Sequence, residues 1–171
     1  MTNILPCAIP EEALLLRYRR EGHYADCYMA EVYVPVRHAE FVEAFYTTWL
    51  FGIERFILKW AVRRPSTDED ARQLGLGNRE EFAAWRVEGR TGNQLLLCDY
   101  TGRTRSWLMT SAVAGTGQAR TRLHFGSAVV PRIDALTGAA SMGSGFNALL
   151  GFHRLYSRLL LRAACANLPS R

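Results

Sequence analysis

The chain has 171 residues, of which 49% are apolar and 22% charged, and its formal net charge is +5 at pH 7. This length and composition fit one globular domain with a core of its own. No apolar run approaches the ~18 residues of a membrane-spanning helix, and the N-terminus lacks the basic region of a secretory signal. We therefore expect a cytoplasmic protein that does not insert into a membrane.

The positive charge does not indicate nucleic-acid binding. Lys59 is the only lysine, and every other basic residue is an arginine. A bias of this kind is typical of the codon usage of a genome, for example a bacterial one. The arginines are dispersed along the chain and form no basic run, so we expect no nucleic-acid partner.

The cysteines are also not arranged for a metal site. Cys7, Cys27, Cys98 and Cys165 are far apart, with no C-x-x-C pair and no histidine at zinc-ligand spacing. Without a secretion signal, we expect four free thiols that act as small apolar residues. The sequence predicts neither a metal nor another cofactor.

The first half of the chain mixes one strand with helices. Residues 1–24 read as an N-terminal lead-in with a short helix from Pro10, broken at Gly22. Residues 26–34 predict a strand, and a helical stripe begins after residue 37. Residues 53–62 are ambiguous, although their length favours a helix. Ser66 and Glu69 then form a predicted capping box for a short helix.

From residue 85 the pattern changes to strands joined by turns. Trp85 and Val87 alternate with Arg86 and Glu88, as expected for a strand with one buried face. Turn residues at 91–93, 99–103 and 114–117 separate predicted strands at 85–89, 94–99, 103–111 and 119–130. Residues 132–145 are predicted to be a loop.

The end of the chain predicts a helix over residues 144–167. Phe146, Leu150, His153, Tyr156 and Leu160 recur at helical spacing on one face, which we expect to pack on the sheet. Arg154, Arg158 and Arg162 fall on the other side. The predicted class is α+β.

This order of elements resembles the START-like or helix-grip superfamily, which includes polyketide cyclases and Bet v 1-like proteins. The resemblance covers residues 25–167 as a single domain and rests on element order. It implies a curved antiparallel sheet that grips a long C-terminal helix, with a helical insert after the first strand. It also implies an internal cavity, whose ligand it leaves open.

His153 is the most notable titratable residue because it lies on the predicted buried face of the last helix. It could bind or polarise a ligand, or act as an acid or base. The alternative, which we favour because no catalytic partner is evident, is a core histidine bonded to a neighbour. No acid shares its helix face, so we expect a neutral imidazole and a folded His153→Phe variant.

Arg105, Trp107 and Met109 share one face of a predicted strand. If that face lines the cavity, the arginine needs a carboxylate or an anionic ligand there. Equally, Arg105 could pair with Asp99 or Glu88 at the sheet edge. On the next strand we expect Arg122 and His124 to face solvent.

The favoured function is therefore the binding of an apolar or aromatic small molecule in a cavity between sheet and helix. The alternatives are a cyclase, dehydratase or hydrolase that uses the same cavity, and a protein-interaction domain with a filled core. No catalytic residue is assigned, and a cavity of several hundred Å³ would favour the first two. The predicted ligand-binding residues are His153, Tyr156, Arg105, Trp107, Trp85, Phe146 and Leu150.

Overall fold

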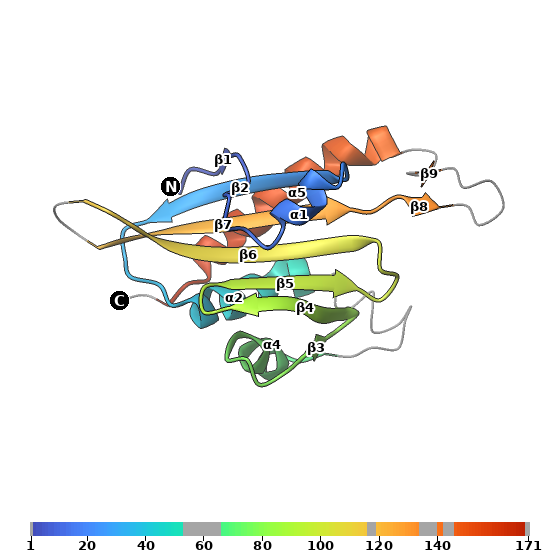
Figure 1. Cartoon of the computed structure of the whole chain (residues 1–171). Coiled ribbons are helices and arrows are strands. Elements are labelled where there is room, and N and C mark those ends of the chain that lie inside the picture. Colours follow the sequence, from blue (N-terminus) through green and yellow to red (C-terminus); the bar gives the residue numbers. More distant parts are fainter. Residues whose placement is uncertain (1, 53–65, 116–118, 134–139, 142–145, 170–171) are drawn as a thin grey trace.

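The computed structural model describes residues 2–52, 66–115, 119–133, 140–141 and 146–169. A seven-stranded antiparallel sheet has the order β1-β2-β7-β6-β5-β4-β3, and β8 and β9 form a separate pair (Figure 1). The strands are β1 (Leu5–Pro6), β2 (Tyr24–Val32), β3 (Glu81–Phe82), β4 (Trp85–Thr91), β5 (Gln94–Asp99), β6 (Thr104–Val113), β7 (Arg120–Val129), β8 (Arg132–Ile133) and β9 (Ala140–Ser141).

The helices are α1 (Leu16–Arg20), α2 (His38–Tyr46), α4 (Asp68–Gly75) and α5 (Phe146–Ala166). In Figure 1, α5 and α2 lie behind the sheet, and α1 lies in front of it. The chain thus has the predicted α+β class, with an antiparallel sheet and a C-terminal helix. No helix in the described part of the chain is long and apolar enough to cross a membrane.

Alternation along the strands gives the sheet two apolar faces. On the face of α2 and α5, buried side chains from the sheet meet those of the helices: Tyr28, Phe41, Phe45, Leu108, Phe125, Leu160 and Ala164 among others. On the opposite face, the N-terminal segment covers a second cluster that includes Leu15, Tyr18, Cys27, Trp107 and Met109. Both faces are therefore shielded from water.

Gln94 holds the N-terminal segment on the sheet. Its side-chain oxygen accepts hydrogen bonds from Leu14 N (2.9 Å) and Trp107 Nε1 (3.0 Å), and its Nε2 donates to Glu12 O (3.0 Å). Leu15 then fits against Gly126, where an added Cβ would lie 2.6 Å from Leu15 Cδ2. Residues expected to be a lead-in thus form a packed layer.

The capping box of α4 lies one residue later than predicted: Thr67 Oγ1 accepts from Asp70 N, and Asp70 Oδ2 accepts from Thr67 N. Thr67 has the extended backbone of an N-cap, so its side chain rather than that of Ser66 caps the helix. The ambiguous residues 53–62 lie outside the described residues.

The described part of α5 turns the expected face towards the sheet. Ser157, Leu160 and Ala164 are buried, whereas Arg154 and Arg158 are exposed. The guanidinium of Arg158 lies 5.4 Å from the centre of the Tyr28 ring, at the β2 side of the helix. The charged side of α5 therefore remains in contact with solvent.

Candidate functional site

A cavity of about 160 Å³ lies between the sheet and α5. Its wall is mostly apolar and aromatic, with a few polar groups from β6, β7 and α5. The lining residues are Phe45, Phe51, Trp85, Thr104, Arg105, Ser106, Phe125, Ser127, His153, Tyr156, Ser157 and Leu160. This volume is below the range of drug-sized pockets and close to that of a single aromatic ring.

The structure brings four of the predicted ligand-binding residues to this cavity: Trp85, Arg105, His153 and Tyr156. Trp107 is fully buried on the opposite face of the sheet, in the cluster with Leu15. Its expected place in the cavity is therefore wrong, because α1 and the segment before it cover that face. Phe146 and Leu150 belong to the part of α5 whose side chains lie outside the described residues.

Arg105 borders the cavity, but its charge is used elsewhere. Its Nε donates to Glu88 Oε2 (2.9 Å) and to Tyr18 Oη (2.8 Å), and its guanidinium stacks over the Tyr18 ring. Of the two expectations for Arg105, the pairing with Glu88 is the one found. The Arg105 guanidinium is thus held by Glu88 and Tyr18 on the face that the N-terminal segment covers, where Glu88 also pairs with Arg17.

A polar cluster joins β2, β7 and α5 at the cavity. Asp26 and Ser127 are direct cross-strand partners, and Ser127 Oγ donates to Asp26 Oδ1 at 2.7 Å. Tyr24 Oη donates to Asp26 Oδ2 at 3.0 Å. His153 Nε2 lies 2.7 Å from Ser127 Oγ and 3.7 Å from Asp26 Oδ2. No acid shares the helix face of His153, but β2 supplies one from the sheet.

Charge in the cluster is concentrated on Asp26. Burial raises the pKa of this carboxyl, but the nearby His153 ring and the Ser127 hydroxyl outweigh burial and hold the pKa below its ordinary value. The phenol of Tyr24 stays protonated because burial raises its pKa to about 12. Arg154 opposes this rise in pKa, and Asp26 adds to it. Asp26 is therefore an ionised acceptor beside a neutral donor.

The hydrogen-bond directions follow from that charge. Ser127 has a single hydroxyl proton, and the ionised Asp26 can only accept it. The Ser127 oxygen must then accept from His153 Nε2–H, which assigns a proton to Nε2. Ser127 is consequently not a nucleophile activated by a histidine base, as in a hydrolase triad.

Two residues that line the cavity each have a buried polar atom without a hydrogen-bond partner among the described residues. These atoms are Trp85 Nε1, a donor, and Ser157 Oγ, a donor and acceptor. A buried polar atom without a partner costs about 1–3 kcal/mol, so such atoms usually meet a ligand or an ordered water. The cavity therefore presents unmet hydrogen-bonding capacity next to an aromatic wall.

Asp26, Ser127 and Tyr24 are the members of this site that sequence reasoning missed. A signal was present, since Tyr24, Asp26 and Tyr28 alternate on β2 and place an acid on the buried face. Similarly, Ser127 continues the inward series of Leu123 and Phe125 on β7. What the sequence did not give was the pairing of β2 with β7.

His124 also departs from the sequence expectation, which placed it in solvent together with Arg122. His124 is 5% exposed and packs near Trp107 beneath the N-terminal segment. Burial lowers the pKa of His124, and Arg122 adds to this effect. Arg122 is partly exposed and pairs with Glu31 at 2.6 Å. The N-terminal layer is again the reason, because it shields the face on which His124 lies.

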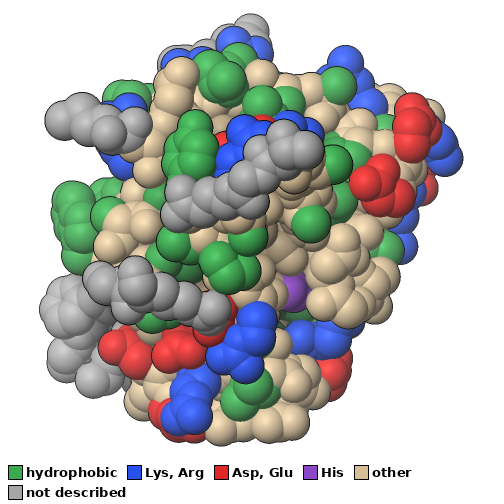
Figure 2. Space-filling model, turned by 90° about the vertical axis from the view of Figure 1, so that its left-hand side faces the viewer, with side chains coloured by type: hydrophobic (Ala, Val, Ile, Leu, Met, Phe, Trp, Pro, Cys, Tyr) green, Lys and Arg blue, Asp and Glu red, His purple; other side chains and the backbone are tan. Residues whose placement is uncertain are grey.

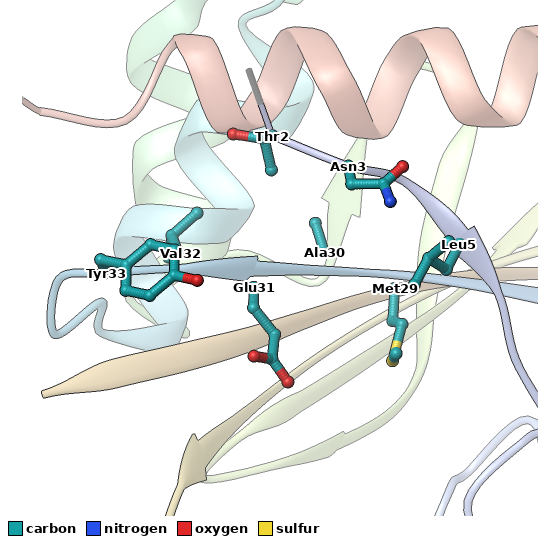
Figure 3. A pocket seen from close by; sticks show the side chains of 8 residues that line it. All are labelled: Thr2, Asn3, Leu5, Met29, Ala30, Glu31, Val32 and Tyr33. Atoms are coloured by element: carbon teal, nitrogen blue, oxygen red, sulfur yellow. The ribbon is translucent and has the colours of Figure 1, made fainter. Parts of the chain in front are cut away.

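Elsewhere the surface is less suited to a small ligand. A larger hollow of about 560 Å³ lies beside β1 and β2, and Figure 3 shows the side chains that line it. Its carboxylate, Glu31, is already paired with Arg120 and Arg122. On the face in Figure 2, basic and acidic side chains are interspersed and form no continuous basic surface.

Comparison of the chain with protein-family models, with curated proteins and with solved structures gives no match. Among the described residues, no group of three or more His, Cys, Asp or Glu side chains could hold a metal ion. The assignment of function consequently depends on the chemistry of the cavity.

Proposed function

We propose that this protein binds a small, neutral molecule, of about the size of one aromatic ring, in the cavity between the sheet and α5. The observation that carries the proposal is the pair of unpartnered buried atoms, Trp85 Nε1 and Ser157 Oγ, in two residues that line this mostly apolar cavity. A ligand oxygen could accept from either group, while the apolar part of the ligand contacts Phe45, Phe125 and Leu160.

The charges of the site support a neutral ligand. Arg105 is paired with Glu88, and Asp26 brings a negative charge close to His153. A ligand carboxylate would lie near Asp26, which is bonded to the lining residue Ser127, and no unpaired arginine among the described lining residues would balance it. Phenols, benzylic alcohols and small ketones have the required combination of a ring or short chain and an acceptor oxygen.

The order of elements is compatible with the helix-grip layout, in which a cavity lies between sheet and last helix. The sheet order β2-β7-β6-β5-β4-β3 with α5 on one face supports this part of the proposal. The cavity is smaller than the several hundred Å³ that would favour ligand binding or catalysis in the sequence analysis, so we propose a correspondingly small ligand.

The test uses matched probes: phenol and benzyl alcohol against toluene, each titrated while ligand NMR signals and the Tm are followed. We expect the oxygen-bearing probes to bind more tightly. Ser157→Ala should weaken phenol binding about tenfold to a hundredfold and leave toluene binding unchanged, since one hydrogen bond is lost. Ser106→Ala is the control, because this hydroxyl in the same wall is bonded to Tyr46. Equal affinity for all three probes, or no binding, would contradict the proposal.

An acid–base enzyme is the second candidate, favoured by the Asp26–Ser127–His153 cluster. Its reacting group would be Nδ1 of His153, with Asp26 and Ser127 fixing the ring. This candidate predicts that His153→Gln abolishes turnover of a bound compound while retaining its binding. If none of the compounds that bind is turned over, the enzyme candidate is rejected and only the binding function remains.

A further inference from the structure

Two thiols from distant parts of the sequence meet where the N-terminal segment joins the sheet. Cys7 follows β1, and Cys27 lies in β2, directly beyond the paired residues Pro6 and Tyr28. Their Sγ atoms are 3.2 Å apart, and Cys7 N donates to Cys27 O at 3.0 Å. All four cysteines are free thiols in the structure. The two backbones are therefore already aligned across a strand pair.

The surroundings suit a reactive thiol at one end of the pair. Cys7 is partly exposed and Cys27 is buried. The hydrogen bond with Cys27 lowers the pKa of Cys7, against an opposing effect of burial, and the Arg122 guanidinium adds to the lowering. Contact with Cys7 and burial both raise the pKa of Cys27. An oxidant can thus reach the more acidic sulfur first, with its partner in place behind it.

We infer that Cys7 and Cys27 form a reversible disulfide that fastens the N-terminal segment to β2. With hydrogen peroxide as oxidant, the Cys7 thiolate attacks one oxygen and becomes a sulfenic acid, releasing hydroxide, which is protonated to water. The Cys27 sulfur then attacks the Cys7 sulfur, the S–S bond forms, and a second water leaves with the Cys27 proton. The two thiols are oxidised and one peroxide is reduced; a dithiol reductant reverses the reaction.

The bridge would act on the layer that covers the second face of the sheet. Figure 3 shows the N-terminal trace with Leu5 beside Met29 of β2, and this contact is short, since β1 has only two residues. The disulfide would close a loop of about 20 residues that contains α1, which stabilises the chain mainly by restricting its unfolded state. Cys98 and Cys165 have no thiol neighbour among the described sulfur contacts and should stay reduced.

The experiment treats the full chain with a stoichiometric amount of hydrogen peroxide, then counts thiols under denaturing conditions and maps peptides by mass spectrometry. We expect the thiol count to fall from four to two, with one linked peptide containing Cys7 and Cys27. The Tm should rise by roughly 6–12 °C and return with dithiothreitol.

Two variants distinguish the formation of the Cys7–Cys27 disulfide from oxidation elsewhere in the chain. Cys7→Ser should lose both the linked peptide and the Tm rise, whereas Cys165→Ala should keep both. The wild-type peptide map requires no substitution, so a poorly folding variant does not weaken the test. Four thiols after treatment, a link that involves Cys98 or Cys165, or Cys7 oxidised to sulfinic acid without a link would overturn the inference.

Discussion

Ser127 Oγ and His153 Nε2 are 2.7 Å apart, although 26 positions separate the two residues in the sequence. The contact joins β7 to α5 and continues through Ser127 to Asp26 of β2. It gives His153 a hydrogen-bonding role in the fold as well as a place in the cavity wall. Substitutions at His153 should therefore lower the stability of the fold. They would have little effect if the ring only packed on an apolar helix face without a hydrogen bond.

For His153 we expect His153→Phe to fold but to lose about 1–2 kcal/mol in the free energy of unfolding, because Ser127 loses its donor. His153→Gln keeps an N–H donor and should lose less. Urea unfolding of both variants at pH 7 measures the difference. If His153→Phe lowers the free energy of unfolding no more than His153→Gln does, the hydrogen bond to Ser127 does not contribute to stability.

For Asp26 we expect a contribution to the free energy of unfolding that depends on pH. Its folded pKa lies below the ordinary value of 3.8, so the unfolded chain binds more protons near that pH. The stabilisation is complete above the unfolded pKa and is lost as the pH falls through about 4 and below. Asp26→Asn should therefore be less stable than wild type at pH 7 and approach it in acid. A stability difference that does not change with pH would contradict this.

His38 should make the protein sensitive to mild acid. Burial lowers its pKa from 6.5 to about 4, with a further effect of the Arg90 charge. Because the folded state binds fewer protons, the stability contributed by neutral His38 is present above pH 6.5 and is lost as the pH falls towards 4. The loss is on the order of 3 kcal/mol at most.

His38→Phe is the comparison that isolates this group, because buried His124 also has a lowered pKa and contributes its own slope. The stability of wild type minus that of the variant should decrease between pH 6.5 and about 4. A constant difference over this window would mean that His38 does not titrate in the folded chain as its burial requires.

Gly126 should tolerate no side chain. A Cβ there would lie 2.6 Å from Leu15 Cδ2 and 2.8 Å from Asp26 O. Leu15 can rotate but the backbone oxygen cannot, so Gly126→Ala should cost about 1–3 kcal/mol. Gly92→Ala is the matched control, since nothing lies within 4 Å of its added Cβ. Equal unfolding midpoints for the two variants would refute this account of the N-terminal layer.

Replacing Ser157 or Ser106 by alanine should have different effects on the stability of the ligand-free protein. The Ser157 hydroxyl is buried without a partner among the described residues, so Ser157→Ala should leave stability unchanged or raise it. The Ser106 hydroxyl is bonded to Tyr46 at 2.9 Å, and Ser106→Ala should cost about 1 kcal/mol. Thermal unfolding of both variants checks this. A larger loss for Ser157→Ala would reveal a structural partner for its hydroxyl.

The sequence by itself determined the local elements and the α+β class. The turn residues near 92 and 102 separate β4, β5 and β6, and the helical period predicts the C-terminal helix where α5 lies. These features depend on contacts between near neighbours in the chain, which composition and periodicity record directly. The same helical spacing placed His153 and Tyr156 on one face of that helix, whereas the cavity was implied by the resemblance.

The tertiary structure decided which faces became interiors and which distant residues met. Alternation along β6 showed that Arg105 and Trp107 share a face of the sheet, but it did not show which layer covers that face. In the structure, residues 12–18 form the covering layer. The pairing of β2 with β7 brought Asp26 to Ser127, and packing of α5 brought His153 to both. Such contacts come from the pairing of strands and layers distant in sequence, which a one-dimensional pattern does not encode.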